Sequence, residues 1–255
     1  MKGRPERVMQ NEDASISIQV GETNLQVDGL LYSIGRAPIF PNGLERVIGQ
    51  AAIGKKGGIL VNEYLRAKKV KNIYACGDCI EGNPQFTHYA GKQGWYCIRN
   101  AFLVGKSNGL VPEMVLRVTF TAPGIGGVGF ATVEEARAKD FKKAVAIRKH
   151  GTHIDRAVCD DENETTYIEL ILSDGKSKAA KIIGGTCVGP RAGETICEIA
   201  LVINNKITLE YVADTIHPYP TNGFGLQQLC SEEATKRFVN SNRKDSKTTV
   251  EFRIQ

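Results

Sequence analysis

The chain has 255 residues, of which 42% are hydrophobic and 24% charged, and its formal net charge is +5. This is enough apolar material for one large or two smaller folded domains, and the composition is unlike that of a disordered chain. The positive charge is spread along the chain apart from a basic stretch at residues 236–247, and no apolar run approaches the roughly 20 residues of a membrane helix, so neither nucleic-acid nor membrane partners are expected.

The seven cysteines are an odd number at irregular spacing. This favours reduced thiols in a reducing compartment, such as the cytoplasm or an organelle interior, over a disulfide framework. Residues 1–13 are polar and charged, so they predict no secretory signal. The compartment itself stays open.

Strand patterns dominate the first part of the chain. Apolar residues alternate with a period of two in the first two expected strands, and the third is a continuous apolar run typical of a buried strand. Five strands are expected, at residues 15–20, 25–28, 30–34, 59–61 and 73–76. A helix is predicted at residues 91–104, where Trp95, Ile98 and Phe102 recur at helical spacing.

The character of the chain changes near residues 110–113, where a proline-containing connection precedes a new strand. We therefore predict two domains, residues 1–112 and 113–255. The second has the pattern of an α+β fold with an antiparallel sheet, whose strands are expected at residues 115–120, 144–148, 167–172 and 181–183, with an additional edge strand at 248–254. Helices are expected from Thr132 and at residues 193–204 and 226–238.

The most informative motif is residues 71–78, KNIYACGD, a short apolar strand that ends in Gly77 and Asp78. An aspartate at this place can accept hydrogen bonds from the ribityl hydroxyls of a flavin, while the glycine lets the backbone approach the ligand. Alone, Gly-Asp after a strand is more often a turn or a helix cap. The flavin interpretation therefore depends on the surrounding sequence.

Two upstream segments supply that context, residues 31–38, LYSIGRAP, and residues 57–61, GGILV. With residues 71–78 they resemble the pyridine nucleotide-disulfide oxidoreductases, the family of dihydrolipoamide dehydrogenase, glutathione reductase and mercuric reductase. The resemblance continues at residues 118–123, 183–185, 189–194 and 217–221. It implies an α/β remainder of the FAD- and NAD(P)-binding domains followed by an α+β dimerisation domain with an antiparallel sheet.

The resemblance also implies a set of cofactor-binding residues. In the family, the segment that corresponds to residues 31–38 closes the nicotinamide-nucleotide domain, and the one that corresponds to residues 71–78 binds FAD. Residues 85–90, QFTHYA, resemble the segment that opens the helix under the flavin. The implied residues are Gly35, Arg36, Gly77, Asp78, Thr87 and His88. For His88 the alternative is a helix-start residue bonded to the backbone.

Residues 217–221, HPYPT, resemble the family's carboxy-terminal active-site motif, which reaches across the dimer to the partner's flavin. The candidate catalytic residues are therefore Tyr219 and His217, the latter in an orienting role. In disulfide-reducing members a proton-handling histidine occupies the place of Tyr219, with a glutamate at the place of Phe224. A tyrosine there is similar to the mercuric reductase branch, although residues 240–255 lack the cysteine pair with which mercuric reductases usually end.

Two further patterns have simpler interpretations. Residues 124–129, GIGGVG, match G-x-G-x-x-G, but a dinucleotide fingerprint needs a parallel strand before it and a helix after it, and Pro123 precedes this one. Residues 76–79 spell C-x-x-C, but a zinc site would need a second ligand pair. We expect structural thiols and no metal site.

As a whole, the resemblance implies an FAD-dependent oxidoreductase that uses NAD(P)H, forms a homodimer and reduces a small-molecule acceptor. The chain lacks the C-x-x-x-x-C redox pair and the amino-terminal G-x-G-x-x-G, so it is expected to begin within the nicotinamide domain and to be inactive alone. The alternative is a catalytically inert dimerisation or interaction module from a truncated reading frame. Retention of Asp78 favours the enzyme.

Overall fold

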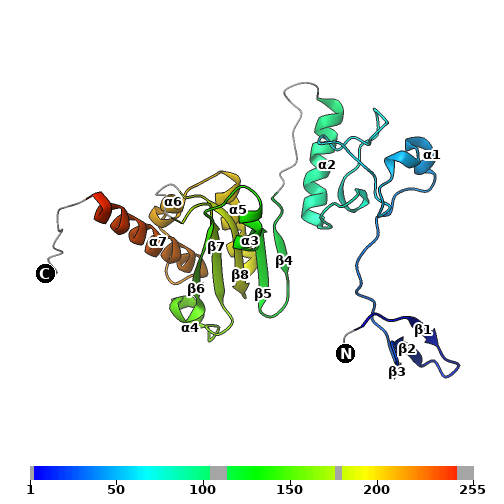
Figure 1. Ribbon diagram of the computed structural model, residues 1–255, viewed down its shortest axis with the longest axis horizontal. Helices are drawn as coiled ribbons and strands as arrows, with labels where there is room; N and C mark the ends of the chain where they lie inside the picture. The colour runs from blue at the N-terminus through cyan, green and yellow to red at the C-terminus, as the bar shows by residue number, and fades with distance from the viewer. Residues whose placement is uncertain (1–2, 104–113, 176–179, 246–255) are drawn as a thin grey trace.

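The computed structural model describes residues 3–103, 114–175 and 180–245. Along the chain these residues form a small sheet, a mostly irregular segment that ends in a long helix, and an α+β unit around a five-stranded sheet (Figure 1). The fold class expected from the sequence is confirmed. The proposed boundary at residues 110–113 and the possible strand at 248–254 lie outside the described residues, and the two domain ranges stay a prediction.

The first sheet is a three-stranded antiparallel meander of β1 (Arg7–Gln10), β2 (Ile16–Val20) and β3 (Thr23–Val27). Strands β2 and β3 confirm the expected strands at residues 15–20 and 25–28. The sequence did not indicate β1, because all four of its residues are exposed and carry no alternation of buried and exposed positions. Ile18 is the buried hydrophobic residue of this sheet.

The strand expected at residues 30–34 is wrong. This segment has no regular secondary structure, and Leu31 and Ile34 are 89% and 92% exposed. A strand needs a neighbour for its backbone N–H and C=O groups, and among the described residues no strand pairs with this segment. The apolar run therefore lies in solvent instead of in a sheet.

The next segment contains α1 (Leu44–Ile48), the 3-10 turns η1 (Gln50–Ala52) and η2 (Gly77–Cys79), and α2 (Thr87–Phe102). The strands expected at residues 59–61 and 73–76 are present only as isolated bridges, such as Ile59 with Ile80 and Arg66 with Tyr74. Ile59 and Ala75 of these segments nevertheless lie in a common core, which is made of Ile48, Ala52, Ile59, Leu65, Ala67, Ala75, Ile80 and Cys97. Helix α2 begins at Thr87, four residues before its expected start.

The second sheet is antiparallel, in the order β4-β5-β8-β7-β6. Its strands are β4 (Arg117–Thr119), β5 (Gly124–Gly129), β6 (Val145–His150), β7 (Tyr167–Leu172) and β8 (Ile182–Gly189). The G-x-G-x-x-G pattern is therefore strand β5. A Cβ at Gly126 would lie 2.8 Å from Ala192 O, so the glycine there lets a helix pack closely on the sheet.

The helices of this unit are α3 (Val133–Ala138), α4 (Asp155–Cys159) after the 3-10 turn η4 (Gly151–His153), α5 (Ala192–Asn204), α6 (Leu209–Asp214) and α7 (Asn222–Asp245). Thr132 caps α3 by accepting a hydrogen bond from Glu135 N, as its sequence indicated. Helix α5 packs on β5 and β8, and its residues Ile196 and Ile199 are fully buried in the main core with Leu170.

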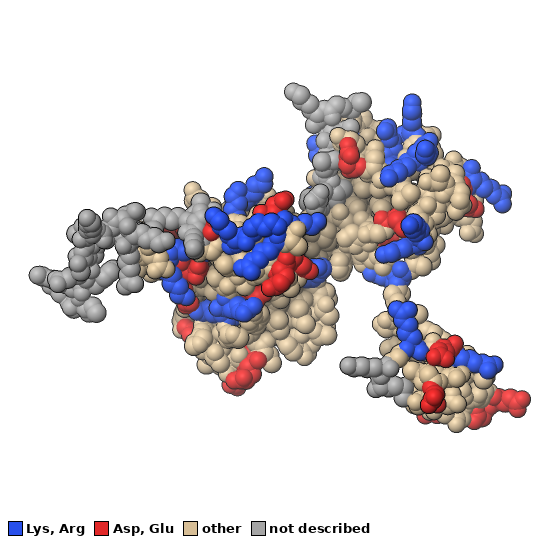
Figure 2. All heavy atoms as spheres, viewed as in Figure 1, with Lys and Arg blue, Asp and Glu red and all other residues tan. Residues whose placement is uncertain are grey.

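On the face shown in Figure 2, basic and acidic side chains are interspersed over the unit around the five-stranded sheet. Within residues 3–103, 114–175 and 180–245, no helix combines the length and the apolar character that crossing a membrane requires.

Candidate functional site

Gly77 and Asp78 stand at the centre of a hydrogen-bonded turn under helix α2. Gly77 has a left-handed φ of +75°, and its N–H donates to Gln93 Oε1 at 2.7 Å. A Cβ at this position would lie 2.8 Å from the Cβ of Ala90, so both the backbone conformation and the closeness of α2 require glycine. The Gln93 side chain is 2% exposed and exchanges two hydrogen bonds with Asn83, of 2.9 and 3.0 Å. The hydrogen bonds of the buried Gln93 side chain thus fix the backbone of the turn.

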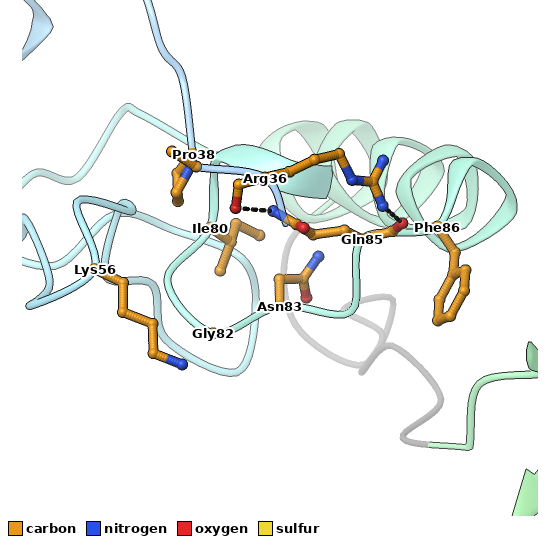
Figure 3. A pocket seen from close by; sticks show the side chains of 9 residues that line it. Arg36, Pro38, Lys56, Ile80, Gly82, Asn83, Gln85 and Phe86 are labelled. Carbon is orange, nitrogen blue, oxygen red and sulfur yellow. Dashed lines mark hydrogen bonds between the residues drawn. The ribbon is translucent and has the colours of Figure 1, made fainter. Parts of the chain in front are cut away.

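Asp78 meets Arg36, which lies 42 positions earlier in the sequence. Their Oδ2 and Nη1 atoms are 3.3 Å apart, and both side chains are substantially exposed. Arg36 also donates from Nη2 to Gln85 O, while Gln85 Nε2 donates to Arg36 O at 3.3 Å (Figure 3). An exposed ion pair contributes about 0–1 kcal/mol, so the Asp78 carboxylate can exchange this partner for another donor at little cost.

A pocket of about 530 Å³ opens beside Arg36 (Figure 3). Its lining comes from three loops and includes the cations of Arg36 and Lys56 and the amides of Asn83 and Gln85. Asp78 is not part of the lining and is linked to the pocket through Arg36. The loop that carries Lys56 is held by Glu81, which accepts 2.9 Å hydrogen bonds from the N–H groups of Lys56 and Gly58; these bonds lower the pKa of Glu81.

The other predicted cofactor residues, Gly35, Thr87 and His88, do not line this pocket. Gly35 has a φ of +114° in the irregular segment that leads to Arg36, and Thr87 is the first residue of α2. The ring of His88 stacks on Phe86, and its Nε2 lies 2.9 Å from Leu116 O. This backbone contact is the alternative considered for His88 from the sequence. Cofactor roles for these three residues stay predictions, as do those for Arg36, Gly77 and Asp78.

The cysteines at this turn have the properties of structural thiols. All seven cysteines are free, and the Cys79 thiol donates to Cys76 O at 3.2 Å. Burial raises the pKa of Cys79, and it raises that of the neighbouring Cys97 to about 12. Thiols with raised pKa values are poor nucleophiles at neutral pH.

The second candidate site is the loop between α6 and α7. His217 is nearly buried, with its Nε2 2.7 Å from Glu198 Oε1 on α5 and its Nδ1 2.7 Å from Thr215 O. Tyr219 is 65% exposed and packs edge-to-face on Phe224, with ring centroids 5.3 Å apart. Its hydrogen bond to Asp155, with the negative charge of that carboxylate, raises the pKa of the Tyr219 phenol.

Several residues of these two sites were not predicted from the sequence: Lys56, Asn83, Gln85 and Gln93 around the first, and Asp155 and Glu198 around the second. Each reaches its site by tertiary folding from a segment without a motif of its own. The exception is Gln85, which stands in the segment 85–90 that the resemblance singled out.

Comparison with known proteins identifies the family. The model of the pyridine nucleotide-disulphide oxidoreductase dimerisation domain matches residues 115–228, and the model of the pyridine nucleotide-disulphide oxidoreductases matches residues 1–94. The chain belongs to this family. The five-stranded sheet and helix α5 lie within the matched dimerisation domain, and Arg36 and Asp78 lie within the other match.

Among its relatives, mercuric reductase from Acidithiobacillus ferrooxidans is 31% identical over 215 residues, which are 84% of this chain and 37% of the relative. Dihydrolipoyl dehydrogenase from Haloferax volcanii is 31% identical over 202 residues, 78% of this chain and 40% of the relative. The crystal structure of LpdA from Mycobacterium tuberculosis superposes with a TM-score of 0.76 at 26% identity, over 92% of this chain and 48% of that one. The chain thus spans less than half of these relatives.

Proposed function

We propose that this chain is the carboxy-terminal part of an FAD-dependent NAD(P)H oxidoreductase that is similar to mercuric reductase, acts as a homodimer and reduces a small-molecule acceptor. Members of the family depend on FAD and NAD(P)H, and the matched dimerisation domain supports a homodimer. The observation that carries the proposal is the Asp78 carboxylate, presented by a fixed glycine turn and paired with Arg36 beside a pocket.

The residues at this turn fit a flavin dinucleotide by their chemistry. Asp78 supplies a carboxylate that accepts hydrogen bonds from ribityl hydroxyls, and its exposed ion pair leaves it available to such donors. Arg36 and Lys56 supply cations for the anionic part of the cofactor. Gln93 and Asn83 hold the turn in place from the buried side. When bound, the flavin supplies the hydride and electron transfer, while the protein supplies position and electrostatics.

On the acceptor side, Tyr219 is the exposed group of the carboxy-terminal motif. Because its pKa is raised, the phenol keeps its proton at neutral pH, which makes it a poor base and a good hydrogen-bond donor. His217, whose two ring nitrogens are both engaged, orients the loop and does not reach the acceptor. This chemistry disfavours substrates that need an imidazole base, such as lipoamide or glutathione disulfide.

Flavin content of the full-length protein tests the proposal. The Asp78→Ala variant loses hydrogen bonds to a charged acceptor, which are worth about 1.5–3 kcal/mol, so FAD affinity should fall by roughly tenfold to a hundredfold. The matched control is Glu63→Ala, an exposed carboxylate of the same segment. Bound flavin is measured by its visible absorbance after dialysis. An Asp78→Ala protein that keeps full flavin would remove the assignment.

A further inference from the structure

The nearly buried histidine of the HPYPT motif is held by a carboxylate from a different element. Glu198 lies in the middle of α5 and comes to His217 across 19 positions of sequence, with Oε1 2.7 Å from Nε2. The His217 side chain is 9% exposed and that of Glu198 33%. Gly223, in the first turn of α7, lies next to this ring, because a Cβ there would be 3.4 Å from His217 Cδ2. Three elements therefore meet at one imidazole.

Both nitrogens of the His217 ring have a hydrogen-bond partner. Thr215 O is an acceptor only, so Nδ1 carries a hydrogen. The second nitrogen, Nε2, lies within hydrogen-bond distance of the Glu198 carboxyl group. Because both nitrogens are occupied by partners from the same chain, the ring is engaged in holding the loop.

The hydrogen bonds that hold His217 also limit the position of Tyr219, which follows two residues later in the same loop. Between His217 and Tyr219 stands Pro218 alone, whose ring fixes φ near about −65°. Pro218 O accepts a 2.7 Å hydrogen bond from Thr221 Oγ1, and Thr221 Oγ1 in turn accepts from Phe224 N at 3.0 Å. The loop between His217 and the start of α7 therefore has few free torsions, and the place of the Tyr219 phenol depends on the anchor at His217.

We propose that Glu198 is a positioning residue for Tyr219, acting through His217 to fix the direction in which the phenol is presented. The relevance to catalysis rests on the proposed role of Tyr219 on the acceptor side, but the positioning itself is a property of this chain. It is tested without flavin, so the result stands apart from the test of the proposed function.

The test uses the full 255-residue chain labelled with 3-fluorotyrosine. The chain has eight tyrosines, and the resonance missing from the Tyr219→Phe spectrum identifies that of Tyr219. Glu198→Gln keeps the size of the side chain and removes its charge, while Glu194→Gln, one turn earlier in the same helix, is the matched control. We expect the Tyr219 resonance to shift or broaden in Glu198→Gln and to stay unchanged in Glu194→Gln. Far-UV circular dichroism verifies that each variant is folded.

A double variant shows whether the effect passes through the histidine. His217→Gln alone should change the Tyr219 resonance, and Glu198→Gln in that background should add nothing further. The chain has four histidines, and His217→Gln assigns the ¹⁵N resonances of His217; the Nε2 resonance should shift in Glu198→Gln, which changes its hydrogen-bond partner, and stay unchanged in Glu194→Gln. An unchanged Tyr219 resonance in Glu198→Gln, or an equal effect in the His217→Gln background, overturns the proposal.

Discussion

The two halves of the described chain bury their apolar residues to different degrees. Around the five-stranded sheet, Ile168, Leu170, Ile196 and Ile199 are at most 2% exposed and every strand has a partner. Large apolar side chains that stay in solvent are more numerous in residues 3–103, among them Leu31, Ile34, Ile39, Trp95 and Phe102, than in residues 114–245, where Phe120 and Ile216 are examples. An exposed apolar run does not stabilise a fold, whatever its propensity, unless other elements cover it. The half with the complete sheet should therefore carry most of the stability.

Amide hydrogen exchange is the most direct test of this difference. Exchange in the centre of β7 and β8 should require opening near the global free energy of unfolding, about 5–15 kcal/mol, because both strands pair on two sides. Residues 28–40, which have no regular structure, should exchange with almost no protection. Mass spectrometry of digested fragments measures both. Equal protection in the two segments would contradict the comparison.

A matched pair of leucines, one from each half, tests this difference in burial more sharply. Leu170 is fully buried in β7, and Leu170→Ala should cost about 2–5 kcal/mol of unfolding free energy through lost burial and the cavity left behind. Leu31 is 89% exposed, and Leu31→Ala should change stability by no more than about 0.5 kcal/mol. Urea denaturation followed by circular dichroism gives both values. A loss of several kcal/mol at Leu31 would mean that its segment is packed.

Two glycines of the five-stranded sheet test how closely helix α5 packs on it. A Cβ at Gly185 would lie 2.8 Å from Ile199 Cγ2, so Gly185→Ala should destabilise the fold by about 1–3 kcal/mol through overpacking. Gly127 has its nearest such neighbour at 3.8 Å, on the Arg117 side chain, and Gly127→Ala should be tolerated. Thermal unfolding of the two variants separates them. Similar losses would show that strand flexibility, and not helix packing, requires these glycines.

The same comparison explains which sequence predictions were correct. Strands β7 and β2 and helix α5 were found because their own periodicity matches the burial that they have in the fold. Residues 30–34 were misassigned because a continuous apolar run carries no information on whether a partner strand is present. At the sites, Gly77, Asp78 and Tyr219 stand in motifs and could be named as candidates, and their roles stay predictions. Gln93, Asp155 and Glu198 are single polar residues of helices, and their partners are set by tertiary packing.

The smallest expected effect concerns the ionisation of Tyr219. Its hydrogen bond to Asp155, followed by the charge of that carboxylate, raises its pKa above the ordinary value of 10.0, so the folded protein favours the protonated phenol. The stabilisation that follows from a raised pKa is complete below the unfolded value and is lost as the pH rises through the folded value. Asp155→Asn should therefore move the titration of Tyr219 downward, toward its ordinary range. Tyr167 is the internal reference, because burial and Glu169 raise its pKa to about 12 independently of Asp155. Titrating tyrosinate absorbance in Asp155→Asn, and again with Tyr219→Phe added to identify the residue, measures the shift. If the curve of Asp155→Asn coincides with that of the unsubstituted chain, Asp155 does not hold the phenol in its protonated form.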